Sequence, residues 1–179
     1  LRESARPVPS GTPALVQLAE DMVDTIHKSR GVGLAATQVG RLEAMCVIDV
    51  PADCEEDDET RAFNAAIAMP LVMFNPVIVA TEGSQDGKEG CLSLPGLSEN
   101  VVRHEKVRLN WLDTDFVEHE QVFEGFLARI IQHEYDHLDG ILYVDRISPI
   151  RKQLIKTKLN NIARGRVRCD YKIKETRKH

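Results

Sequence analysis

Residues 125–138 carry a helical pattern in which two histidines share a face with apolar side chains. The positions on this face recur at helical spacing and are Phe126, Ile130, His133 and His137. Burying imidazoles beside apolar neighbours is costly unless the rings have polar partners. We therefore predict a central helix that ends at Asp139-Gly140 and holds its histidines at a site.

The run His133-Glu134-Tyr135-Asp136-His137 within this helix is typical of a hydrolytic metal site. Histidines four residues apart lie about one helical turn apart, so both imidazoles reach one divalent cation. Glu134 then reaches water in the open coordination position, takes its proton and later delivers a proton to the leaving group. Such a short run also arises by chance on surface helices, but the apolar neighbours favour a site.

The third ligand distinguishes classes of metal hydrolase. The long zinc-protease motif has a third histidine six residues after the second, where this chain has Tyr143. A downstream glutamate ligand is possible only through Glu175 in a polar tail, so the third ligand should lie upstream. An isolated Cys91 would more often be a small buried hydrophobe. Combined with the two histidines, its thiolate completes three ligands and leaves one position for water.

Helices are predicted at both ends of the chain. Thr12-Pro13 is typical of a helix start, and this first helix should end at Gly31. A last helix should begin at Ser148-Pro149 and end at Gly165. Its apolar stripe is Ile150, Leu154, Ile155, Leu159 and Ile162.

Strands are predicted mainly in the middle, at 44–50, 72–81, 101–112 and 118–123, the last two as a pair around a turn. Pro76 implies an edge or a bulge. The acidic stretch 51–61 indicates an exposed loop, and 89–96 a short turn-rich segment.

These elements indicate the α+β class. We predict a mostly antiparallel sheet packed around the central metal-binding helix, with an N-terminal helix and a C-terminal helix. The 179 residues suffice for one core, without internal repeats. We place a single catalytic domain at 1–165 and a basic tail at 166–179.

Cysteine usage and charge add two limits. The four cysteines are far apart and form no CxxC pair, which fits a reducing compartment. Cys46 lies in an apolar run and should be a core residue, whereas Cys54 and Cys169 lie in polar segments.

Residues 151–179 carry eleven Lys or Arg and two acids, a net charge of +9 in a chain of net charge -5. This segment is either a solvated basic helix or a contact for a polyanion.

Three motifs resemble those of peptide deformylases, in the family order. Gly31-Val32-Gly33-Leu34-Ala35-Ala36-Thr37-Gln38 resembles GxGxAAxQ, Glu89-Gly90-Cys91-Leu92-Ser93 resembles EGCLS, and Gln132-His133-Glu134-Tyr135-Asp136-His137 resembles QHExDH. The resemblance runs from about Leu1 to Ile162, and the three motifs together are far more specific than any one. The acidic stretch with residues 62–70, and the tail, look longer than in the simplest members.

The resemblance implies removal of the formyl group from the N-terminal N-formylmethionine of newly synthesised polypeptides, with release of formate. It implies Cys91, His133 and His137 as ligands of one divalent metal, usually Fe2+, with Zn2+, Ni2+ or Co2+ able to occupy the site. It also implies the Gln38 side-chain amide and the Leu92 backbone N–H as oxyanion donors.

A methionine side chain requires a flexible apolar pocket. On the resemblance, the substrate-binding residues are Gly31, Val32, Gly33, Gly90, Phe126 and Ile130. The peptide should lie beside residues 31–33 as an added strand. Around the site we expect Glu89 to pair with Arg103, Asp136 to be structural, and Arg129 to be solvated or ion-paired.

The implied partners are N-formylmethionyl nascent polypeptides, and the basic C-terminal segment is a candidate for docking on ribosomal RNA. No apolar run approaches the roughly 18 residues that cross a bilayer, so no membrane partner is expected. We expect a bacterial cytoplasmic protein, or an organelle matrix protein if a leader has been removed, since the chain begins at Leu1 rather than Met. An HExxH metallopeptidase is the alternative function, and a non-catalytic binding module is a third hypothesis.

Overall fold

Two antiparallel sheets frame the protein, for which the computed structural model describes residues 1–51, 54–55 and 57–173. The larger sheet has the strand order β1-β2-β3-β6-β7, and the smaller sheet pairs β4 with β5. The larger sheet contains β1 (Gly33–Ala35), β2 (Met45–Ile48), β3 (Leu71–Glu82), β6 (Lys106–Leu112) and β7 (Glu118–Glu124). The smaller sheet contains β4 (Gln85–Gly90) and β5 (Ser98–Arg103). All pairings between these strands are antiparallel, which confirms the predicted class.

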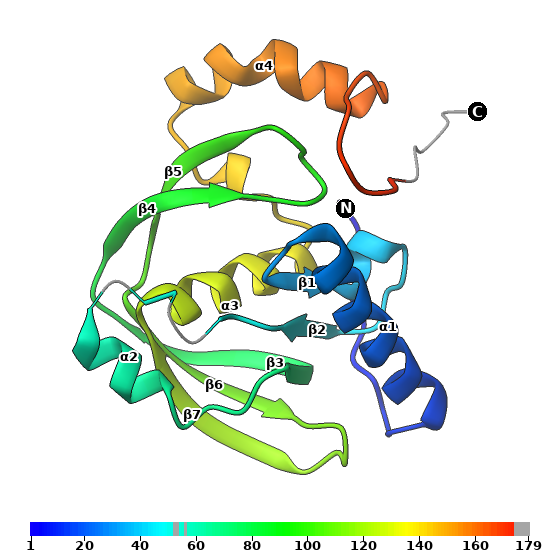
Figure 1. Ribbon diagram of the computed structural model, residues 1–179, viewed down its shortest axis with the longest axis vertical. Coiled ribbons are helices and arrows are strands. Elements are labelled where there is room, and N and C mark those ends of the chain that lie inside the picture. Colours follow the sequence, from blue (N-terminus) through cyan, green and yellow to red (C-terminus); the bar gives the residue numbers. More distant parts are fainter. Residues whose placement is uncertain (52–53, 56, 174–179) are drawn as a thin grey trace.

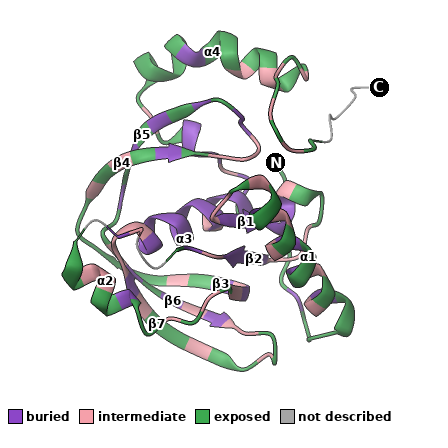
Figure 2. Ribbon diagram, viewed as in Figure 1, coloured by how far each residue is buried: buried purple, intermediate pink, exposed green. Residues whose placement is uncertain are grey.

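Helix α3 (Gly125–Leu138) lies between the two sheets at the centre of the molecule (Figure 1). Most of its residues are buried, as Figure 2 shows. Both histidines are among the buried residues. Leu127 and Ile131 belong to the same apolar core as Leu109 and Phe123 of the larger sheet. The helix therefore has the bounds and the central position that its sequence pattern predicted.

Helix α1 (Pro13–Ser29) begins and ends close to the predicted positions. The Thr12 side chain accepts a hydrogen bond from the Leu15 N–H, which caps the helix, and Arg30 ends it in a left-handed conformation. Its buried side chains pack with β1 and β2 and are Leu15, Ala19, Met22 and Ile26. In the described part of the chain, no helix has the length and apolar character needed to span a membrane.

Helix α4 (Pro149–Ala163) begins at the predicted Ser148 cap, but its predicted apolar stripe is only partly right. Ile155, Leu159 and Ile162 pack on the cluster that contains Leu97 and Val101, close to the smaller sheet. Ile150 and Leu154 are 76% and 68% exposed. The helix rests on this layer along one narrow face, and these two side chains point away from that face.

The acidic stretch 51–61 is not simply an exposed loop, although residues 52, 53 and 56 lie outside the described residues. Helix α2 (Asp58–Asn64) begins within it, with the Asp57 side chain as its cap. Glu55 is buried, and its carboxylate accepts hydrogen bonds from the N–H groups of Phe126 and Leu127 at 2.9 and 3.0 Å. The Glu55 carboxylate thereby provides hydrogen-bond acceptors for N–H groups in the first turn of α3, which has no side-chain cap of its own.

One strand prediction also needs correction. The expected strand 101–112 is divided at His104, so that β5 pairs with β4 while β6 pairs with β7. The side chain of Gln132 on α3 bonds both the N–H and the carbonyl of His104, which holds the chain where it leaves one sheet for the other. The polar strand β4 was not predicted. Pro76 lies in an interior strand at a register shift between Phe74 and Val77, so it marks a bulge and not an edge.

Candidate active site

Cys91, His133 and His137 converge on one point beside α3. Their ligand atoms all lie within 4.8 Å of one another, and Cys91 Sγ is 3.3 Å from His137 Nε2. Metal–ligand distances in tetrahedral sites place neighbouring ligand atoms roughly 3.5 Å apart, so the cluster has the size of such a site. A thiolate with two imidazoles is also a donor set that suits divalent transition metals. The residues present therefore fit a metal ion.

The two imidazoles differ in their surroundings. Burial lowers the pKa of His137 to about 3, which keeps this ring neutral. Burial also lowers the pKa of His133, but hydrogen bonds with Cys91 and Glu89 outweigh this and raise it to about 10. Coordination through the His133 ring would therefore require loss of a proton.

Glu89 fixes the orientation of His133. Its carboxylate lies 2.9 Å from His133 Nδ1 and can only accept a hydrogen bond when ionised, so Nδ1 carries the proton and Nε2 is left for the metal. The ring of Tyr143 stacks on the His133 ring, with centroids 5.9 Å apart, and the Tyr143 hydroxyl donates to the Leu97 carbonyl. Tyr143 thus supports His133 by packing and is not among the clustered ligands.

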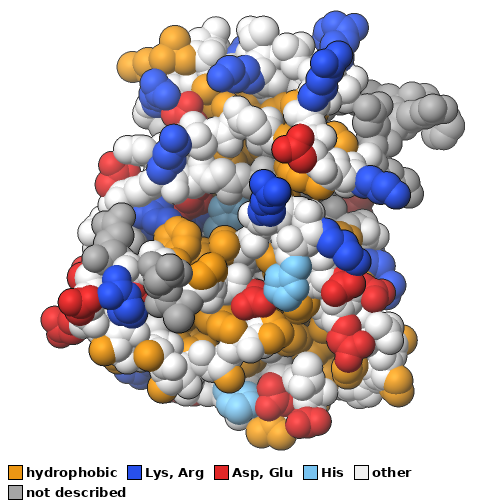
Figure 3. All heavy atoms as spheres, viewed as in Figure 1, with side chains coloured by type: hydrophobic (Ala, Val, Ile, Leu, Met, Phe, Trp, Pro, Cys, Tyr) orange, Lys and Arg blue, Asp and Glu red, His pale blue; other side chains and the backbone are white. Residues whose placement is uncertain are grey.

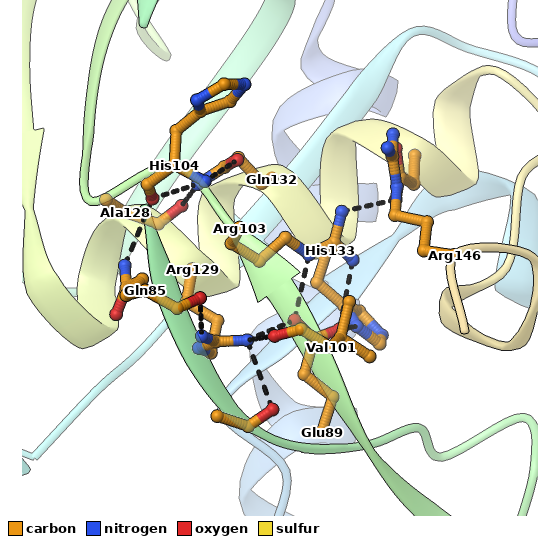
Figure 4. Close-up of polar contacts among 12 residues, drawn as sticks. Gln85, Glu89, Val101, Arg103, His104, Ala128, Arg129, Gln132, His133 and Arg146 are labelled. Atoms are coloured by element: carbon orange, nitrogen blue, oxygen red, sulfur yellow. Dashed lines mark hydrogen bonds and ion pairs between the residues drawn. The ribbon is translucent and has the colours of Figure 1, made fainter. Parts of the chain in front are cut away.

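Two arginines hold Glu89 in place (Figure 4). Arg103 donates to both carboxylate oxygens at 2.8 and 2.9 Å, and Arg129 donates to Oε1 at 2.9 Å. Burial alone would raise the pKa of Glu89, but hydrogen bonds with Arg103 and His133 lower it to about 2. The predicted pair of Glu89 with Arg103 is confirmed. Arg129 is ion-paired and only 4% exposed, so the solvated alternative is wrong.

The same network ties α3 to the smaller sheet. Arg103 on β5 also donates to Asp136 on α3 at 2.6 Å, and Arg146 pairs with the same carboxylate. Arg129 on α3 donates to the carbonyls of Gln85 and Val101 in β4 and β5. Because Cys91 directly follows β4, these contacts bring the thiol to the histidines of α3. Asp136 therefore has a structural role, as expected, because its carboxylate binds Arg103 and Arg146.

Glu134 is buried beside the three clustered residues. It is 3% exposed, and its Oε2 has no hydrogen-bond partner in the described part of the chain. Burial raises the pKa of Glu134 to about 7, although nearby His133 opposes the rise. A buried carboxylate whose oxygen is free to meet another molecule can accept and return a proton.

Gln38 and Leu92 flank Cys91. The Gln38 carbonyl oxygen accepts from the Ala35 N–H at 2.8 Å, which aims the amide nitrogen at Cys91 Sγ and Ser93 Oγ, 3.5 and 3.1 Å away. This bond forms within the short helix Ala36–Val39. Leu92 packs against Gly31, where an added methyl group would lie 2.7 Å from Leu92 Cδ1. The Gln38 amide nitrogen therefore borders the ligand cluster, and Leu92 directly follows Cys91 in the chain.

A cavity of about 550 Å³ opens onto this cluster. Its lining includes all but one of the site residues expected from the sequence: Gly31, Val32, Gly33, Gln38, Gly90, Cys91, Leu92, Phe126, Ile130, His133 and Glu134. His137 does not line the cavity and is 1% exposed. Sequence reasoning missed the opposite wall at 94–98 and the C-terminal Tyr171, because no motif marks either.

Comparison with known proteins gives the family. The family model described as polypeptide deformylase matches residues 1–153. A peptide deformylase of Salinibacter ruber is 41% identical over 172 residues, covering 96% of this chain and 87% of that protein. The crystal structure of a peptide deformylase from Legionella pneumophila is 39% identical, with a TM-score of 0.76 over 92% of this chain and 90% of that chain. A Plasmodium falciparum peptide deformylase structure, 29% identical, gives a TM-score of 0.80 over 92% and 91%. The chain therefore belongs to the peptide deformylase family.

Proposed function

We propose that this chain removes the formyl group from the N-terminal formylmethionine of newly synthesised polypeptides and releases formate. Its family consists of metal-dependent hydrolases that act on the formyl group of nascent peptides. The observation that carries the proposal is that Glu134 lines the same cavity as Cys91 and His133, which cluster with His137. A buried carboxylate with an unpaired oxygen beside three metal-binding side chains is suited to hydrolysis.

In this proposal Cys91, His133 and His137 hold one divalent metal, which supplies a Lewis acid and lowers the pKa of water. Glu134 takes a proton from the attacking water and later delivers it to the amine that leaves. The Gln38 amide and the Leu92 N–H donate to the formyl oxygen as negative charge develops there. Glu89 keeps the His133 ring in the required orientation.

The substrate's methionine side chain would lie against Val32, Phe126 and Ile130, which line the cavity. Its backbone would extend beside residues 31–33. Strand β1 is an edge strand of the larger sheet, so one side of it has no strand partner among the described residues. An extended peptide can add to such an edge through main-chain hydrogen bonds.

Glu134→Gln tests the catalytic role, because it keeps the shape of the side chain and removes its basicity. We expect metal content to be retained and formate release from a formyl-Met peptide to fall by about 100- to 10,000-fold. Matched unformylated peptides serve as the control for internal cleavage. Full turnover in Glu134→Gln would show that Glu134 is not the general base.

We also propose Fe2+ as the metal loaded in the cell, on the strength of the family resemblance and the donor set. Metal analysis after anaerobic purification tests this, with Zn2+, Ni2+ and Co2+ as the other possible results. Cys91→Ser should weaken metal binding, because an alcohol is a harder and far less acidic ligand than a thiol. Unchanged metal content in Cys91→Ser would point to a different third ligand.

The metallopeptidase alternative is not favoured by the comparisons.

Two further proposals concern where the enzyme works. The +9 charge of residues 151–179 supports docking on ribosomal RNA. Salt-sensitive cosedimentation with ribosomes that is lost on deleting this segment would support it, and equal binding after the deletion would contradict it. The bacterial relatives support a cytoplasmic location, which cell fractionation tests.

A further inference from the structure

The C-terminal segment returns to the candidate active site after α4. The chain turns at Gly165, which has a φ of 67°, and runs back toward α1 and β1 (Figure 1). The Tyr171 hydroxyl donates to the Leu92 carbonyl at 2.8 Å, across 79 positions of sequence. Tyr171 also lines the active-site cavity. The segment therefore forms part of the wall of the substrate site.

Beyond Tyr171 a second hollow, of about 520 Å³, adjoins the active-site cavity. The two share Arg30, Pro95, Gly96 and Tyr171 in their linings. The rest of the second lining comes from the end of α1 and from the C-terminal segment: Lys28, Ser29, Arg168, Cys169 and Asp170. A peptide too long for the first cavity can thus continue into the second.

The direction of the bound peptide leads to the second hollow. Glu134 lies directly against Gly33, so the formyl end of a substrate belongs at the Gly33 end of residues 31–33. An extended peptide that pairs with this edge then runs toward Gly31 and Arg30. Each residue of an extended strand adds about 3.3 Å. The residues after the formylmethionine therefore pass Arg30, which both cavities share.

The second hollow is basic. Arg30 and Arg168 are exposed, and neither side chain makes a hydrogen bond or ion pair within the described residues. The Lys28 ammonium group is bound to Asp24 at 2.9 Å, and Asp170 is the one acidic residue among the described residues of the lining. Figure 3 shows several separate basic side chains on this face, with an acidic side chain among them, between α4 and the end of α1.

We propose that this second hollow is a subsite for an acidic residue of the substrate, downstream of the formylmethionine, with Arg30 and Arg168 as the residues that select it. Tyr171 is a positioning residue, because its bond to Leu92 keeps the segment with Arg168 at the rim. The inference rests on the proposed deformylase activity and adds a preference at the far end of the same site.

Metal-loaded enzyme and synthetic peptides test it. The reference is formyl-Met followed by four alanines, and Asp or Lys replaces the alanines one at a time. We expect Asp to raise kcat/KM by roughly two- to five-fold at one or more positions in low salt, and Lys at the same position to lower it. The ratio of kcat/KM for the Asp peptide to kcat/KM for the Ala peptide should fall in 0.5 M salt. At about 0.1 M salt, exposed charges more than roughly 10 Å apart are already screened, and 0.5 M salt screens them further.

Arg30→Gln with Arg168→Gln should bring the Asp-to-Ala ratio close to one. Tyr171→Phe should lower the ratio in part, since it removes only the bond to Leu92. Arg164→Gln is the matched control, because it removes an exposed arginine that lines neither cavity and should keep the wild-type ratio.

The outcomes separate this inference from the proposed function. Failure of the wild type to release formate from the all-alanine peptide would overturn the deformylase activity itself. Normal release with equal kcat/KM for Asp, Ala and Lys at every position would overturn only the acidic subsite. An Asp preference that persists in the double arginine variant would also overturn it.

Discussion

A methyl group at Gly33 would lie 2.5 Å from Oε1 of Glu134, so the backbone of β1 and the buried carboxylate occupy adjoining space. Real Cβ atoms essentially never lie this close to a non-bonded heavy atom, and Glu134 has little room to move because it is 3% exposed. Glycine at this position is therefore explained by close approach and not by an unusual backbone angle.

We predict that Gly33→Ala displaces the Glu134 carboxylate and lowers kcat by about 100-fold, because a shift near 1 Å can have that effect on a reacting group. Steady-state formate release measures the change. Metal content should be unchanged, since the atoms nearest to the added methyl group belong to Glu134 and not to the three clustered ligands. Wild-type kcat in the folded variant would show that the carboxylate tolerates displacement.

Glu89→Gln should be strongly destabilising, because buried Arg129 loses its one ion pair among the described residues and buried Arg103 keeps only Asp136. Breaking a buried charge pair in this way typically lowers the free energy of unfolding by about 3–5 kcal/mol. The variant should also bind metal about 10- to 100-fold more weakly, since Glu89 orients His133. Chemical denaturation and metal titration measure the two effects.

The control for Glu89→Gln is Asp24→Asn on α1. Its partner Lys28 is exposed, so we expect no measurable loss of stability. Equal stability of Glu89→Gln and the wild type would show that the arginines find other acceptors.

Local patterns in the sequence sufficed to predict α1, α3 and the start of α4. Each has a cap or a periodic stripe within its own residues, such as Thr12 for α1 and the spacing of His133 and His137 for α3. The division of 101–112 was missed because its cause lies elsewhere, in the bonds from Gln132 to His104. Strand β4 was missed because its sequence is polar and its burial alternates only after pairing with β5.

The same distinction applies to the site. His133, Glu134 and His137 lie close together in the sequence, and Cys91, Gln38 and Leu92 belong to motifs that could be compared with a family. Tyr171 lies 79 residues from Leu92 in a segment without a motif, so only the folded chain brings the two together.

Glu55 offers a test of capping from a distance. Glu55→Ala removes the acceptor for the Phe126 and Leu127 N–H groups and for the Asn64 amide. We expect the free energy of unfolding to fall by about 2 kcal/mol, as for loss of a strong N-terminal cap. Urea unfolding measures it, with the exposed Glu59→Ala on α2 as the control. A loss no larger than that of the control would mean that other groups cap α3.

Asp145 should make stability depend on pH. Partial burial alone would raise its pKa, but hydrogen bonds with Arg2 and Lys152 hold the pKa of Asp145 well below its ordinary value of 3.8. A carboxylate with a depressed folded-state pKa stabilises the fold above its unfolded-state pKa, and this contribution is lost as pH falls through the folded-state value. Asp145→Asn should therefore have a lower free energy of unfolding than the wild type at pH 7, by about 1 kcal/mol for a partly exposed ion pair. This difference in free energy of unfolding should decrease below pH 3.8. The difference is measured by thermal unfolding of both proteins from pH 7 to the lowest pH at which they remain folded. A difference in stability that stays constant over this range would show that it does not come from the ion pairs of Asp145.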